Sequence, residues 1–220
     1  MNSKELARYF ILWLGLAAFV GILSGSASAI FLVSLDWATN FREANLWLIA
    51  FLPLAGFGIG YVYHHFGANS TKGNNLLLDE LYQSKNPIPL RMTPLVLFGT
   101  IFTHLFGGSA GREGTAVQMG GSLADQLTKW FSLHKSNRRI ILICGVAGGF
   151  ASVFGTPLAG AVFSLEWMLV RKFRWQSVFP AFLAAFVSHS VCELAWGVGH
   201  THYSIPVIPA HTLLNLAWVI

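Results

Sequence analysis

The residues best suited to chemistry lie in one short glycine-rich segment, Gly107–Thr115. Its four glycines, at positions 107, 108, 111 and 114, allow the backbone to turn sharply and to approach a ligand closely. A helical pattern follows at once, so the first peptide N–H groups of that helix have no partner within it and point back into the segment. Together with the helix dipole they attract anions, and the segment therefore predicts an anion-binding helix N-terminus.

A single carboxylate, Glu113, stands at the start of this helix. A carboxylate inside a membrane is costly and is a functional hypothesis by default. Its anionic side chain could fill the same pocket as the anion, and protonation would release it. Glu113 would then both block the path and carry a proton. The alternative is a glutamate that only caps its helix.

The composition places this segment in a membrane. Of the 220 residues, 54% are hydrophobic and only 10% are charged, whereas a soluble domain carries about 25% charge. The mean hydropathy of +0.57 excludes a disordered chain, a coiled coil and a soluble enzyme. Five charge-free stretches run between Arg8 and Asp36, Glu43 and Lys72, Arg91 and Arg112, Arg139 and Glu166, and Arg174 and Glu193. Each is long enough for a helix to cross the hydrocarbon, which takes roughly 20 residues.

The basic residues gather at the ends of these apolar stretches, at Lys4 and Arg8, at Lys129 to Arg139 and at Arg171 to Arg174. Membrane proteins use this placement to fix their orientation, and the short basic N-terminus favours a cytoplasmic start. The net charge of +5 therefore does not indicate nucleic-acid binding.

These observations predict an all-α integral membrane protein: a polytopic bundle with broken and re-entrant helices, forming one transmembrane domain over residues 1–220. A turn at Gly73–Leu76 precedes a piece, Leu77–Tyr82, that is too short to cross. Irregular backbone at membrane depth must be buried in protein or line a wet cavity, so we expect a half-helix here. The expected longer helices are Tyr9–Leu35, Ala44–His65, Met92–Phe106, Arg112–Trp130, Ile140–Phe154, Pro157–Val170 and Trp175–Gly197.

Pairs of glycines at helical spacing predict close contacts between helix backbones. The pairs are Gly21 with Gly25, Gly56 with Gly60, and Gly145 with Gly149. Cys144 and Cys192 lie in apolar stretches and are expected to be buried free thiols.

Two other kinds of site are weighed and rejected. The run from Gly107 to Gly111 fits the G-x-S-x-G hydrolase motif, with His104 as a nominal base for Ser109. That motif needs a preceding strand, and the preceding segment is helical in pattern, so no enzymatic activity is expected. His200, His202 and His211 lie near Glu193, but their irregular spacing favours interfacial histidines. We therefore expect no metal and no cofactor.

Residues 107–121 resemble the signature of the CLC family of anion channels and anion/proton antiporters, and so do residues 148–160 with Phe163 and Glu166. The similarity covers nearly the whole chain but only the first half of the family's inverted repeat. It implies a homodimer with a pore in each subunit, in which Pro157–Val170 and Trp175–Gly197 form the interface.

The same resemblance implies roles for individual residues. Glu113 would be the gating and proton-transferring glutamate, and Asn74 the inner anion contact. The outer anion path would be lined by the backbone of Gly111, Arg112, Gly114, Thr115 and Ala116.

Three departures from the family pattern bear on the substrate. Asn74 stands where a serine is usual, Thr115 where a proline is usual, and Trp167 where many antiporters carry a second glutamate. All three resemble the bacterial branch that exports fluoride in exchange for protons. An amide donor also suits a small, strongly hydrated anion.

The expected function is therefore fluoride/proton antiport in a cell membrane, by resemblance a bacterial inner membrane. The alternatives are a chloride channel, a chloride/proton antiporter, or a truncated fragment that does not transport. The expected partners are fluoride or chloride, protons, the lipid bilayer, and a second copy of the chain or a separate C-terminal half.

Overall fold

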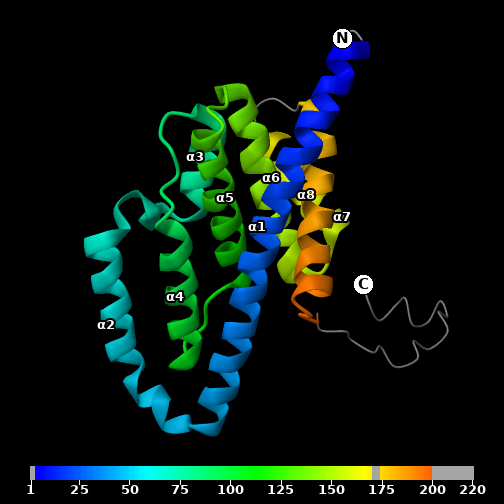
Figure 1. The fold of residues 1–220 in the computed structure, drawn as a ribbon. Coiled ribbons are helices and arrows are strands. Elements are labelled where there is room, and N and C mark those ends of the chain that lie inside the picture. The colour runs from blue at the N-terminus through cyan, green and yellow to red at the C-terminus, as the bar shows by residue number, and fades with distance from the viewer. Residues whose placement is uncertain (1–2, 170–173, 200–220) are drawn as a thin grey trace, which may run out of the picture.

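Every regular element of the computed structural model, which describes residues 3–169 and 174–199, is a helix (Figure 1). The α-helices are α1 Ser3–Ala44, α2 Leu52–Val62, α3 Asn74–Gln83, α4 Met92–Leu105, α5 Arg112–Trp130, α6 Lys135–Phe154, α7 Pro157–Leu169 and α8 Val178–Ser190. Shorter 3-10 or π-helical pieces are η1 Leu46–Phe51, η2 Tyr63–Gly67, η3 Ala68–Lys72, η4 Trp175–Ser177 and η5 Val191–Ala195. The all-α prediction is confirmed.

Within the described residues, four helical runs are long and apolar enough to cross a membrane. They are Tyr9–Ala44, Leu46–Lys72, Lys135–Phe154 and Trp175–Ala195, while Met92–Leu105 is apolar but shorter. The half-helix expected after the Gly73–Leu76 turn is α3, which has ten residues.

Several predicted boundaries were wrong, among them the starts of α1 and α3, and two of the differences have identifiable reasons. Helix α1 continues from Leu35 to Ala44, because charged residues end an apolar stretch without breaking a helix. At about 1.5 Å per residue, its 42 residues extend about 63 Å. Helix α6 begins at Lys135 rather than Ile140, because the side chain of His134 accepts a hydrogen bond from the backbone N–H of Ser136 and caps the helix.

Helix α1 runs diagonally along the whole bundle (Figure 1) and packs against α4, α5, α6 and α8. Helices α5 and α6 form the centre, with α7 and α8 on one side and α2 and α4 on the other. Gly155, with φ 69°, ends α6, and Pro157 starts α7 at the first helical position, so the two helices turn sharply into contact.

Glycines bring the backbones of α5 and α6 into direct contact. A Cβ on Gly145 would lie 2.5 Å from the carbonyl oxygen of Gly120, and one on Gly149 would lie 2.3 Å from that of Ala116. Gly21 and Gly25 of α1 meet α8 equally closely, at 2.8 Å from Val187 and 2.4 Å from Ser188. The glycine-pair prediction holds for these two pairs.

Gly56 and Gly60, by contrast, have nothing within 4 Å of an added Cβ among the described residues. The same spacing therefore marks a contact in α1 and α6 but not in α2.

We predict that Gly145→Ala lowers the free energy of unfolding by about 1–3 kcal/mol, because the new methyl group meets backbone that cannot move aside. Gly56→Ala is the matched control. It should be neutral or slightly stabilising, since alanine has the higher helix propensity. Thermal unfolding in detergent measures both, and equal midpoints for the two variants would contradict the packing argument.

Candidate anion-binding site

Helix α5 begins half way along the bundle rather than at its end. The chain turns after α4 at Gly107, whose φ of 83° favours glycine, and the Gly108 N–H donates to the carbonyl of Thr103 at 2.8 Å. It then returns beside α4 to start α5 at about the midpoint of α1 (Figure 1). The N-cap residue is Gly111, which has no side chain. No side-chain cap therefore bonds to the first peptide N–H groups of α5.

Glu113 lies in the first turn of α5 and is exposed on the surface of the described chain. Its Oε2 atom is 3.1 Å from the position that a Cβ would take on Gly111, so the carboxylate lies beside the helix start. No hydrogen bond or ion pair joins Glu113 to another residue within 3–169 and 174–199. Its neighbour Arg112 is also exposed.

The other residues predicted to line the outer anion path become more buried along the start of α5. Gly111 is exposed, Gly114 half-buried, and Thr115 and Ala116 are buried. The Thr115 hydroxyl lies 2.7 Å from that of Thr100 in α4 and also donates to the carbonyl of Gly111 at 3.2 Å. Its side chain therefore stabilises the α4–α5 contact. Its backbone N–H, which a proline would lack, is retained.

Asn74 is the first residue of α3, and the structure places it next to Gly114, 40 positions further along the chain. Gly73 precedes it with φ 56°, a conformation that favours glycine and aims the helix start inward. The Nδ2 atom of Asn74 lies 3.5 Å from the Cβ position of Gly114. Its Oδ1 atom is buried and has no hydrogen-bond partner among the described residues. The N-terminal ends of α3 and α5 thus meet at Asn74 and Gly114.

Sequence reasoning missed a third side chain at this meeting point. The Nε2 atom of Gln118 lies 3.3 Å from the Cβ position of Gly73 and 3.7 Å from that of Gly114. Residue 118 follows Gly114 by four positions, so both lie on one face of α5. That spacing was the only signal in the sequence.

A buried ion cluster fixes the position of α3. Arg138 of α6 donates from Nε to Asp125 at 2.7 Å and from Nη1 to Glu80 of α3 at 3.0 Å. The same guanidinium donates from Nη2 to the carbonyl of Asn86 at 2.8 Å, and Asp125 accepts from the N–H of Ile88 at 2.6 Å. The charge pattern had placed Arg138 in the basic cluster of Lys129 to Arg139. The structure shows in addition that its side chain is buried, at 7% exposed, and paired with two carboxylates.

Further contacts hold α3 from both sides. The hydroxyl of Tyr82, near the end of α3, donates to the carbonyl of Trp167 in α7 at 2.9 Å. Leu77 fills the space left by Gly121, where an added Cβ would lie 2.3 Å from the leucine Cδ2. Together with the ion cluster, these contacts set how closely Asn74 approaches Gly114.

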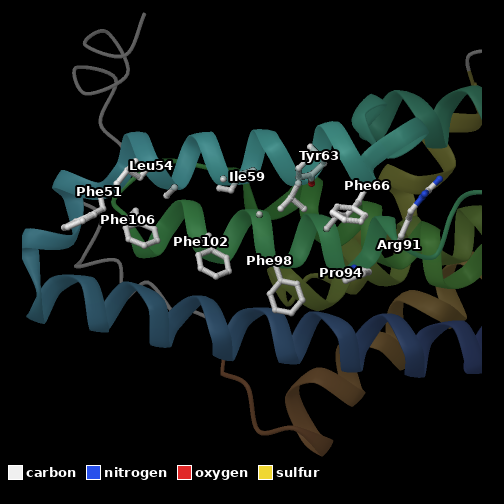
Figure 2. A pocket seen from close by; sticks show the side chains of 15 residues that line it. Phe51, Leu54, Ile59, Tyr63, Phe66, Arg91, Pro94, Phe98, Phe102 and Phe106 are labelled. Carbon is white, nitrogen blue, oxygen red and sulfur yellow. The ribbon is translucent and has the colours of Figure 1, made fainter.

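A large apolar groove lies elsewhere, between α2 and α4 (Figure 2). Its volume is about 660 Å³, and aromatic and aliphatic side chains line it from Phe51 at one end to Arg91 at the other. Neither Asn74 nor Glu113 lines it. A groove with so few polar groups lacks the donors that an anion needs, so it is not the anion site.

The serine of the hydrolase motif, the two cysteines and the candidate metal ligands lie in different surroundings. Ser109 is exposed and follows helix α4 rather than a strand, and the Nδ1 atom of His104 lies 2.9 Å from the carbonyl of Thr100. Cys144 and Cys192 are buried and free, as expected. Within the described ranges no three His, Cys, Asp or Glu side chains cluster as metal ligands would. His200, His202 and His211 lie outside those ranges.

Comparison with known proteins gives one consistent picture. Residues 55–220 match the family model described as "Voltage gated chloride channel". A "Chloride/fluoride channel protein" of Pseudomonas syringae pv. tomato is 54% identical over 209 residues, which cover 94% of this chain and 46% of that protein. An "H(+)/Cl(-) exchange transporter ClcA" of Vibrio cholerae is 33% identical over 180 residues, covering 76% of this chain and 38% of the transporter.

Two solved structures share the fold. One described as a CLC-type fluoride/proton antiporter superposes with a TM-score of 0.86 at 34% identity and covers all of this chain and 54% of its own. A slow cyanobacterial Cl⁻/H⁺ antiporter gives 0.67 at 26% identity, covering 83% of this chain and 46% of its own. The chain spans about half the length of the curated relatives it matches.

We predict that Arg138→Met lowers the free energy of unfolding by about 3–5 kcal/mol, because it leaves the carboxylates of Glu80 and Asp125 buried and unpaired. The control is Lys72→Met, which breaks the ion pair between Lys72 of η3 and Asp79 of α3. Asp79 is the neighbour of Glu80 in the sequence. Both partners of that pair are more than half exposed, and its loss should cost at most about 1 kcal/mol. Chemical denaturation in detergent distinguishes them, and equal losses would refute the role of burial.

Proposed function

The chain belongs to the voltage gated chloride channel family, and from that premise we propose that it forms the first half of a fluoride/proton antiport pathway. The observation that carries the proposal is the meeting of Asn74 with Gly114, where two helix N-termini converge beside Glu113. The function proposed is transport rather than enzymatic catalysis.

Two helix N-termini aimed at one point provide the attraction for an anion. Each carries partial positive charge on unpaired N–H groups, and each is fixed by its own packing before the anion arrives. The site lies half way along the bundle (Figure 1), at the depth of the hydrocarbon, where an electrostatic attraction is stronger than in water.

Glu113 supplies the gate and the proton. Its carboxylate, beside Gly111, competes with the anion for the N–H groups at the start of α5. Once protonated it no longer competes, so the anion can take its place while Glu113 carries the proton. Its exposure on the described half leaves it free to swing, and the remainder of a full-length protein would enclose it.

Fluoride is favoured over chloride by the side chain of Asn74. A primary amide presents fixed N–H donors that suit a small, strongly hydrated anion. The 54% identical relative is described as a chloride/fluoride channel, and the solved structure with a TM-score of 0.86 as a fluoride/proton antiporter. Chloride/proton antiport or a chloride channel is the second candidate, favoured by the 33% identical exchange transporters.

The distribution of charge supports an orientation in the membrane. The start of α1, the end of α5 and the start of α6 lie at one end of the bundle (Figure 1), and these segments carry most of the predicted basic clusters. By the positive-inside tendency this end faces the cytoplasm, here of a bacterial inner membrane.

A homodimer through α7 and α8 is the proposed assembly. Apolar side chains are exposed along this side, including Leu158, Val162, Phe186 and Leu194. Contact between two copies would bury them. A separate C-terminal half is the other partner that the half-length match allows.

We predict that Glu113→Gln, in a protein that contains both halves, uncouples proton flow from anion flow, because glutamine cannot exchange a proton. Glu43→Gln removes an exposed carboxylate at the end of α1 and should keep coupling intact. Proteoliposome assays of anion efflux with simultaneous proton uptake measure both variants. Unchanged proton coupling in Glu113→Gln would refute the proposed role.

The 220-residue chain assayed alone tests the alternative that it is a fragment that does not transport. Absence of anion flux would favour that alternative.

A second variant tests selectivity. Asn74→Ser should shift the preference from fluoride towards chloride, because it replaces the amide with the hydroxyl usual in the family. Asn75→Ser changes the exposed neighbour and should leave the ratio unaltered. The ratio of fluoride to chloride efflux from proteoliposomes is the readout. If Asn74→Ser leaves that ratio at the wild-type value, the inner-contact assignment is wrong.

A further inference from the structure

We propose that the side-chain amide of Gln118 is a ligand of the transported anion and, with Asn74, sets the selectivity of the site. This inference rests on the proposed function and adds a residue to its machinery. The anion would lie where the starts of α3 and α5 meet and would accept hydrogen bonds from two primary amides and from backbone N–H groups.

The position of Gln118 carries the first step. Its Nε2 atom is 3.3 Å from the Cβ position of Gly73, which precedes α3, and 3.7 Å from that of Gly114, in the first turn of α5. The amide therefore spans the space between the two helix starts. Asn74 reaches the same point with its Nδ2 atom, 3.5 Å from the Cβ position of Gly114. Two amide nitrogens thus flank a single glycine.

Neither amide is fully used within the protein. No hydrogen bond joins Gln118 to another residue in the described part of the chain, although its side chain is half-buried. The Nδ2 atom of Asn74, the donor that faces Gly114, likewise makes no hydrogen bond to another residue there. Partly buried N–H donors left unpaired cost free energy, which an anion that accepts hydrogen bonds from them would recover.

A second glutamine on the same helix gives an internal comparison. Gln126 lies eight residues after Gln118, and its Nε2 atom donates to the carbonyls of Ile88 at 3.0 Å and Ser122 at 2.9 Å. It fastens the segment before α4 to α5. The two side chains are identical, but one is occupied by backbone and the other is aimed at the helix starts. The difference indicates a ligand role for Gln118 and a structural one for Gln126.

Neutral amides suit a transport site. An ammonium or guanidinium group would hold an anion strongly, whereas conduction requires binding that is favourable for entry yet weak enough for release. Gly114 has no side chain, so the anion can approach both amides and the backbone together.

The test uses the full-length protein and isothermal titration with fluoride and chloride. Gln118→Met keeps the size of the side chain and removes its donors, so the Kd for fluoride should rise about ten-fold or more while the unfolding midpoint changes little. Gln118→Glu should bind more weakly still near neutral pH, because a carboxylate repels the anion. Gln126→Met is the control: it should lower the unfolding midpoint and leave the ratio of the two affinities unchanged.

Each outcome decides one way. Wild-type affinity for both anions in Gln118→Met would overturn the proposal and leave the proposed function standing. A loss of affinity accompanied by the same loss of stability as in Gln126→Met would assign Gln118 to packing and also overturn it. If the wild-type protein binds and moves neither anion, the proposed function itself fails.

Discussion

The anion site depends on one buried interaction, the ion cluster of Arg138 with Glu80 and Asp125. These side chains are 7%, 6% and 0% exposed, and the guanidinium also binds the carbonyl of Asn86. Burying charges carries a desolvation cost that their attraction only partly offsets, so such a cluster is a poor means of gaining stability alone. Its geometric consequence is clearer: it fastens α3 to α5 and α6. Only with α3 held there does Asn74 reach Gly114.

Close backbone packing complements this cluster. Contacts of Gly145 and Gly149 with α5 fix the central helix pair, and the turn at Gly107 lets α5 start half way along the bundle (Figure 1) instead of at its end. The free N–H groups of α5 are thereby carried to the depth at which α3 begins. At an end of the bundle, in bulk water, the same helix starts would attract an anion only weakly, because water screens the charge. The fold therefore brings the partial positive charge of two helix N-termini together half way along the bundle.

The sequence predicted what depends on local pattern. Charge-free stretches indicated the helices, and the Gly73–Leu76 turn indicated the half-helix α3. Contacts between residues that lie far apart along the chain were not predicted. Arg138 stands in a basic segment at the end of an apolar stretch, and its partner Glu80 is 58 positions away. Gln118 looked like an ordinary helix residue, because nothing in its neighbours along the chain shows that α3 begins beside it. The end of α1 was misplaced because the first charged residue marks the end of the apolar stretch, whereas the helix continues beyond it.

The central claim is that the anion binds where the starts of α3 and α5 meet. Solid-state NMR can measure this directly, by recoupling the dipolar interaction between bound ¹⁹F⁻ and ¹⁵N-labelled side-chain amides in a protein that contains both halves. The account predicts dephasing of the Asn74 amide signal, identified by its absence in an Asn74→Ser sample. Bound fluoride that leaves the Asn74 signal unaffected would contradict it.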